Sequence, residues 1–150
     1  MIIRTLLNID TKTIMNAFNS AFSDYVIKLQ LTEESLLNKI TCENITLDSS
    51  VGAYEGDILI AFVLNGLREV NGKKTVYNAG TGVIPEHRGK RIIESLYHYF
   101  LPVLEDQGYT HHQLEVIQGN EKAIRIYKKP GFEISRTFSC FRGKVDRLNK

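Results

Sequence analysis

The sequence predicts a mixed α/β domain in which helices cover a central sheet. Two observations carry this prediction. Apolar residues recur at helical spacing in four segments, and a run rich in β-branched and aromatic residues, divided by two turn signals, lies between the second and third of these segments. The predicted order is strand, two helices, three strands, helix, strand, helix, strand. A chain of 150 residues fits one domain, spanning residues 1–150.

The first third of the chain predicts one strand and two helices. Residues 2–9 alternate weakly between apolar and polar and favour a strand. Asp10 and Thr11 are N-cap candidates for one helix, and Thr32 for the next, while residues 41–50 have loop character. The apolar residues that define the two helices are Ile14, Met15, Ala17, Phe18 and Phe22, then Leu36, Leu37 and Ile40.

A β-meander follows these helices. Residues 51–54 and 58–67 predict a hairpin around Glu55-Gly56-Asp57, and the Asn71-Gly72 turn leads into a strand over 75–84. Gly80 and Gly82 lie inside that strand, where glycines mark a bulge or a close approach of the backbone.

The remaining segments alternate between helix and strand. Pro85 ends the strand, and a helix runs from about Arg88 to Gln107-Gly108, with Pro102 expected to kink or shorten it near His98. Residues 111–117 predict a short strand. Asn120 caps a further helix that closes at Pro130-Gly131, and Glu133–Phe141 predicts the final strand.

Composition excludes several classes of protein. The net charge of +2 is too balanced for a nucleic-acid-binding arm, and no apolar run approaches the length of a membrane span. The N-terminus does not resemble a signal peptide, and the two cysteines favour a reduced, cytoplasmic chain. Acidic residues outnumber basic ones up to residue 60 and basic residues dominate afterwards, which suits a cation at the first half and phosphates at the second.

Several catalytic motifs are also missing. Gly80-Thr81-Gly82 lacks the third glycine of a dinucleotide fingerprint, Gly89-Lys90 lacks the first glycine of a P-loop, and no G-x-S-x-G elbow occurs. His111 and His112 are adjacent on a predicted strand and have no companions at ligand spacing, so we expect no metal site.

One segment, from Thr81 to Arg91, has the character of an anion site. A strand ends in a turn of small and basic residues that leads into a helix N-terminus. The first amides of a helix are unpaired and the helix dipole is positive there, and three basic side chains add charge.

This segment and a second one downstream together resemble the GNAT superfamily of acyl-CoA-dependent N-acetyltransferases. The strand–Pro–x–x–Arg–Gly segment is similar to the family's pyrophosphate motif, and Asn120, Ala123, Ile124, Tyr127 and Gly131-Phe132 are similar to its next helix. The resemblance is close over residues 51–133. It implies a mixed, mostly antiparallel sheet with a splayed pair of parallel strands and helices on both faces.

The resemblance implies a cofactor site for acetyl-CoA. The backbone of Val83 would bind the pantetheine arm and polarise the thioester carbonyl. Asn120 would contact the pantetheine or adenosine arm with its side chain, and Tyr127 would protonate the departing thiolate as general acid. The backbone amides that would bind the pyrophosphate belong to Arg88, Gly89, Lys90, Arg91, Ile92 and Ile93.

Relatives usually carry small residues where this chain has Arg91 and Ile93. Arg91 could keep the amide contact or push the cofactor outward, and Ile93 should pack against the sheet.

The base that takes the proton of the amine has more than one candidate. Glu115 lies twelve residues before Tyr127, a spacing similar to that of ribosomal-protein alanine acetyltransferases. Asn78 and Thr81 could orient a water instead, and His111 or His112 is a further alternative. Cys140 is expected in the core.

The resemblance implies direct transfer of an acetyl group to a primary amine of a small molecule or peptide, without metal or covalent enzyme intermediate. Asp24, Glu33 and Glu34 could attract that amine. The alternative is a non-catalytic acyl-CoA-binding or regulatory module. We expect no nucleic-acid or membrane partner.

The chain ends in a basic Lys144–Lys150 segment. It could belong to a longer protein or borrow a strand from a partner, so a homodimer is left open.

Overall fold

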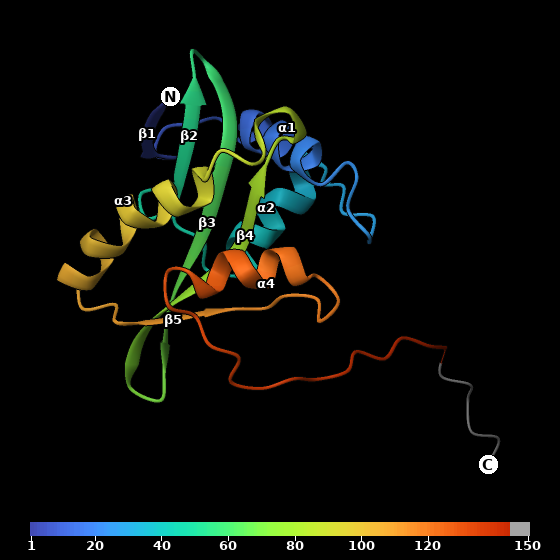
Figure 1. Cartoon of the computed structure of the whole chain (residues 1–150), viewed down its shortest axis with the longest axis vertical. Coiled ribbons are helices and arrows are strands. Elements are labelled where there is room, and N and C mark those ends of the chain that lie inside the picture. Colours follow the sequence, from blue (N-terminus) through green and yellow to red (C-terminus); the bar gives the residue numbers. More distant parts are fainter. Residues whose placement is uncertain (145–150) are drawn as a thin grey trace.

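The computed structural model describes residues 1–144 and contains a five-stranded sheet with helices on both faces (Figure 1). Neighbouring strands pair antiparallel except β4 and β5, which are parallel. The predicted mixed sheet with one parallel pair is therefore confirmed. In sheet order the strands are β1 (Ile2–Thr5), β2 (Val51–Glu55), β3 (Ile58–Val70), β4 (Lys73–Val83) and β5 (His111–Leu114).

Three of the four α-helices begin at the caps that the sequence predicts. The side chain of Asp10 accepts from the amide of Thr13 at 2.9 Å, and Thr32 forms a capping box with Ser35. Asn120 accepts from the amide of Ala123 at 3.1 Å. These helices are α1 (Thr11–Ala21), α2 (Glu33–Cys42) and α4 (Glu121–Lys128), and the fourth is α3 (Ile92–Asp106).

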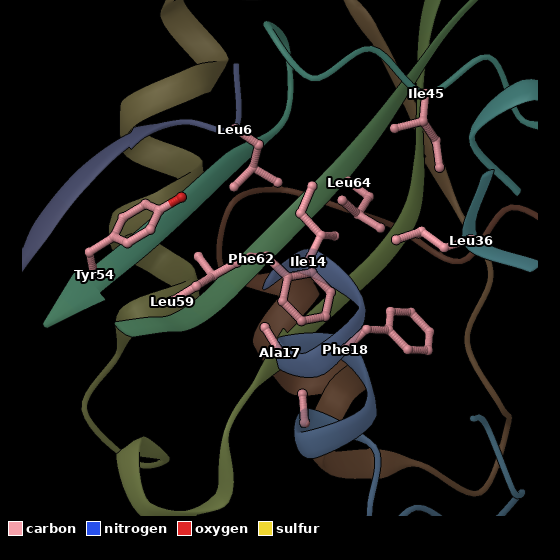
Figure 2. Packing of buried hydrophobic residues seen from close by; sticks show 11 residues of the cluster. Leu6, Ile14, Ala17, Phe18, Leu36, Ile45, Tyr54, Leu59, Phe62 and Leu64 are labelled. Atoms are coloured by element: carbon pink, nitrogen blue, oxygen red, sulfur yellow. The ribbon is translucent and has the colours of Figure 1, made fainter. Parts of the chain in front are cut away.

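The core divides into two clusters because side chains alternate between the faces of β3. Phe62 and Leu64 point toward α1 and α2, where they meet Ile14, Phe18 and Leu36 (Figure 2). The intervening Ala61 and Val63 belong to the second cluster, which includes Leu96, Phe100 and Leu104 of α3. Alternation along one buried strand thus fixes both helical layers.

A β-bulge interrupts the pairing of β3 and β4. Leu64 pairs with Gly80 and Asn65 pairs with Asn78, which leaves Ala79 as the extra residue on β4. Beyond it, Gly80 and Gly82 face α1. A Cβ atom on Gly82 would lie 2.7 Å from the Cβ of Ala21, so this glycine permits the close approach of helix and strand that its position predicts.

Helix α3 differs from the prediction at its start and at Pro102. It begins at Ile92 rather than Arg88, because Pro85–His87 forms a 3-10 turn and both Gly89 and Arg91 have positive φ. It then continues past Pro102 to Asp106. The proline does not end it, since buried Phe100 and Leu104 on either side of Pro102 pack in the same cluster.

The predicted final strand is wrong. Residues 133–144 form no strand and run away from the sheet (Figure 1). Ile134, Phe138 and Phe141 are 63%, 52% and 95% exposed, and Cys140 is exposed rather than in the core. Alternation alone does not make a strand, because a strand also needs a partner edge for its backbone groups. Strands β1 and β5 are also shorter than predicted, and residues 145–150 of the basic C-terminal segment lie outside the described part.

Within residues 1–144, no helix has the length and apolar character needed to span a membrane.

The close contact between β4 and α1 predicts a specific stability effect. Gly82→Ala would force a methyl group against Ala21 and the ring of Phe62, which would lie 2.8 Å away. We expect a loss of about 1–3 kcal/mol in the free energy of unfolding, measured by denaturant titration. Gly119→Ala is the control, because a Cβ there meets nothing within 4 Å. Equal stability of the two variants would contradict the tight packing.

Candidate active site

The sheet opens between β4 and β5. Their parallel pairing runs from Thr75 and His111 to Asn78 and Leu114, where β5 ends. Strand β4 continues to Val83 and pairs there only with β3. The edge of residues 79–83 that faces away from β3 therefore has no partner strand in the described chain, which is the splay that the resemblance implies.

Two backbone amides of β4 point into this opening. The amide of Ile84 donates to Ile60 on β3 at 2.9 Å, so alternation directs the amides of Val83 and Thr81 toward the opposite edge. The carbonyl of Val83 faces the same way and accepts from Nε of Arg88 at 3.2 Å. Val83 thus lies at the open edge with its amide available, as its expected role requires.

Asn78 holds the bulge beside the opening. Its Oδ1 accepts from the amide of Gly80 at 3.0 Å, while its Nδ2 donates to Oγ1 of Thr81 at 2.6 Å and to the phenol of Tyr97 at 2.8 Å. Because of the bulge, Asn78 and Thr81 lie on the same face of β4. They form the polar floor of the opening.

Tyr127 of α4 packs against this floor. Its ring lies 6.4 Å from that of Tyr97 and 6.0 Å from that of Phe132, centroid to centroid. Burial raises the pKa of its phenol, an effect that Thr81 and Asn78 partly offset. Tyr127 is therefore protonated at neutral pH and can donate a proton.

Glu115 lies just beyond the end of β5, where the pairing with β4 stops. It follows the last residue of β5 and is exposed. After the larger effect of burial, the charges of Glu115 and of Glu43 at the end of α2 both raise the pKa of Tyr77. The structure thus brings Tyr127 to Asn78 and Thr81, and does not bring Glu115 into contact with Tyr127.

A run of unpaired amides follows the open edge. The first backbone bond into α3 joins the amide of Ser95 to the carbonyl of Arg91, and among residues 1–144 no acceptor pairs with the amides of residues 89–94. Gly89 and Arg91 have φ angles of 80° and 57°. Arg91 thus adopts the left-handed conformation that glycine adopts more readily, and its side chain is 76% exposed, so it leaves the amides uncovered. Ile93 packs against the core as predicted.

The side chain of Arg88 does not point to these amides. Its guanidinium forms a bidentate pair with Asp24 at 2.6 and 2.8 Å and donates to the carbonyl of Ala21 at 2.9 Å. Asp24 is therefore paired with Arg88 rather than open to an amine, which corrects its expected role. The amide of Arg88 donates to the carbonyl of Pro85 at 3.3 Å, so it is not free for the expected contact with a pyrophosphate, and the side chain stabilises the loop after α1.

The same loop reaches the other side of the opening through Tyr25. The side chain of Asn120 donates to the phenol of Tyr25 at 3.4 Å while it caps α4. Residues 22–32, here called the α1–α2 loop, are thus tied both to the end of β4 and to the start of α4. Tyr25 was not singled out from the sequence, because no motif marks a loop tyrosine.

The pair of Asp24 and Arg88 predicts how the α1–α2 loop responds to pH. Arg88 lowers the pKa of Asp24 through a hydrogen bond, so the pair persists at neutral pH and is lost as the pH falls through that lowered value. We expect Asp24→Asn to speed amide exchange in residues 22–32 at neutral pH. Asp57→Asn, on the exposed turn between β2 and β3, is the control. Unchanged exchange in Asp24→Asn would show that the pair does not order the loop.

Sequence and structure comparisons agree on the family of the chain. The family model for GNAT acetyltransferases matches residues 12–132. A search of curated proteins finds no significant match. Three solved structures share the fold: an aminoglycoside 6'-N-acetyltransferase from Acinetobacter haemolyticus (21% identity, TM-score 0.69, 97% of this chain and all of that one), a ribosomal-protein-alanine N-acetyltransferase from Brucella melitensis biovar Abortus 2308 (16%, 0.72, 95% and 100%), and an aminoglycoside acetyltransferase in complex with a bisubstrate analogue of CoA (15%, 0.71, 96% and 98%).

The matched residues include the open edge of β4, the unpaired amides that follow it and Tyr127 on α4, and the shared fold extends over almost the whole chain. This protein belongs to the GNAT family of acetyltransferases.

Proposed function

We propose that the protein transfers an acetyl group from acetyl-CoA directly to a primary amine. One observation carries the proposal: the unpaired edge of β4 is followed, after the 3-10 turn of Pro85–His87, by the unpaired amides of residues 89–94. An extended amide-bearing arm can add to a strand edge, and a pyrophosphate suits a cluster of free amides at a helix N-terminus. The arrangement of these groups in sequence fits the order of groups in CoA.

Each expected cofactor residue except Arg88 has a role in this proposal. Val83 offers its amide to the thioester carbonyl, and the charge that develops on that oxygen during attack strengthens the contact. Gly89, Lys90, Arg91, Ile92 and Ile93 offer backbone amides to the pyrophosphate, whereas the amide of Arg88 already donates to the carbonyl of Pro85 at 3.3 Å. Asn120 lies at the start of α4, beside the path of the pantetheine arm. When bound, acetyl-CoA supplies the activated acetyl group.

Two protons must move during the reaction. The attacking amine loses one, and the departing thiolate of CoA gains one. We assign Tyr127 as the acid, because its phenol is protonated at neutral pH and lies beside the open edge. Glu115 is the base, or a water held by Asn78 and Thr81 takes the proton from the amine on the way to solvent.

The acceptor is an amine of a small molecule or of a peptide. Similar structures include enzymes that their names describe as acting on aminoglycosides and on a ribosomal-protein alanine. A panel that contains aminoglycosides, polyamines, amino acids and peptides with free N-termini therefore tests the proposal, with labelled acetyl-CoA as donor. Acetylated product supports it. If the protein binds acetyl-CoA but acetylates no amine of the panel, the non-catalytic module is favoured instead.

Tyr127→Phe tests the acid. The phenyl ring keeps the packing with Tyr97 and Phe132 but has no proton to give. We expect turnover to fall by about 10²-fold or more, with the affinity for acetyl-CoA nearly unchanged. Tyr99→Phe, on the exposed side of α3, is the control for the loss of a phenol. An unchanged rate in Tyr127→Phe would remove this residue from the chemistry.

Glu115→Gln tests the base through the pH dependence of the rate. Removing a base should depress turnover most at low pH, where the amine is hardest to deprotonate. A steeper fall toward low pH than in the wild type is therefore expected. If the loss is the same at every pH, the water held by Asn78 and Thr81 is the better assignment.

A further inference from the structure

Two cations from different elements converge on one carboxylate at the start of α3. Glu94 lies in the first turn of this helix, and its side chain is only 22% exposed. Nζ of Lys129, just beyond α4, pairs with its Oε1. Nε of Arg91 lies 3.8 Å from the same oxygen. The pair of Glu94 and Lys129 therefore links α3 to α4 beside the opening of the sheet.

This carboxylate lies among the groups that we assign to the pyrophosphate. Glu94 carries the last of the unpaired amides of residues 89–94, and Arg91 belongs to the same run. Lys129 lowers the pKa of Glu94 through a hydrogen bond, so the carboxylate is charged at neutral pH. An anion is thus already present where the free amides and the helix dipole favour negative charge.

A resident anion has two effects on an incoming phosphate. It repels the phosphate, and it engages cations that would otherwise be free to bind phosphate oxygens. Arg91 and Lys129 are 76% and 48% exposed, so both can turn toward a ligand without leaving a buried position. Glu94 is fixed on the helix, whereas its two partners are long and flexible.

We infer that Glu94 is a built-in competitor of the cofactor pyrophosphate, and that Lys129 is a phosphate-binding residue which exchanges Glu94 for the cofactor. The inference rests on the proposed function and adds to it a determinant of cofactor affinity. An ordinary role for Glu94 would be to stabilise the N-terminus of α3, and that role involves no ligand. The two roles predict different binding behaviour.

Calorimetric titration of the full chain with CoA separates these roles. Glu94→Gln keeps the shape and a hydrogen-bonding side chain but removes the charge. We expect CoA to bind this variant about three- to tenfold more tightly than the wild type, with a smaller gain at high salt. Pantetheine, which lacks the phosphates, should bind both proteins alike. Asp57→Asn, which removes an acid from the exposed turn between β2 and β3, is the control and should leave the affinity for CoA unchanged.

A double-mutant cycle then isolates Lys129. Lys129→Met should weaken CoA binding both in the wild type and in the Glu94→Gln background, because the lysine contacts phosphate in each. Lys128→Met, on the neighbouring exposed residue, is the matched control. Thermal unfolding of every variant verifies that each remains folded.

Three results would overturn the inference. If CoA binds the wild type and Glu94→Gln with equal affinity, Glu94 does not compete with the pyrophosphate, and the proposed function stands. A Lys129→Met change that has no effect in the Glu94→Gln background shows that the lysine only neutralises Glu94. Absence of CoA binding to both proteins contradicts the inference and the proposed function together.

Discussion

The arrangement of the site depends on the bulge at Ala79 and on the side chain of Asn78 that stabilises it. An extra residue in a strand exchanges the faces to which all later side chains point. Here the exchange places Thr81 on the same face as Asn78, directs Gly80 and Gly82 toward α1, and leaves the amide of Val83 at the open edge. Without the bulge, the side chains of Thr81 and Val83 would face α1 in place of the glycines.

The hydrogen bonds of Asn78 explain why the opening remains ordered. Its amide group connects the amide of Gly80, the hydroxyl of Thr81 and the phenol of Tyr97, so strand and helix α3 are joined at the point where β5 departs. Tyr97 is almost fully buried. A polar network that is satisfied inside the protein favours one arrangement over others, since unpaired alternatives are costly. The floor of the site is therefore preformed.

The side chain of Arg88 and the backbone amides that follow it have different roles. Arg88 uses its guanidinium to hold the α1–α2 loop through Asp24 and Ala21. The amides of residues 89–94 have no acceptor among residues 1–144. The segment from Arg88 to Glu94 thus combines a side chain that stabilises a loop with backbone amides that are free to bind an anion.

Local signals predicted much of this structure, and tertiary contacts decided the rest. The caps at Asp10, Thr32 and Asn120 and the Asn71-Gly72 turn depend on near neighbours in the chain, and each is confirmed. The prediction of a final strand at Glu133–Phe141 was wrong, because this segment pairs with no other strand in the described chain. The pairing of Asp24 with Arg88 joins residues 64 positions apart, so no local sequence pattern predicts it.

In the proposed function, acetyl-CoA binds along the open edge of β4 and at the free amides of residues 89–94. Amide hydrogen exchange, resolved residue by residue with and without acetyl-CoA, tests this binding mode. We predict slower exchange at Thr81 and Val83 and across residues 89–94, with little change on β1 at the far edge of the sheet. If acetyl-CoA binds without slowing exchange at these amides, it does not bind along this edge.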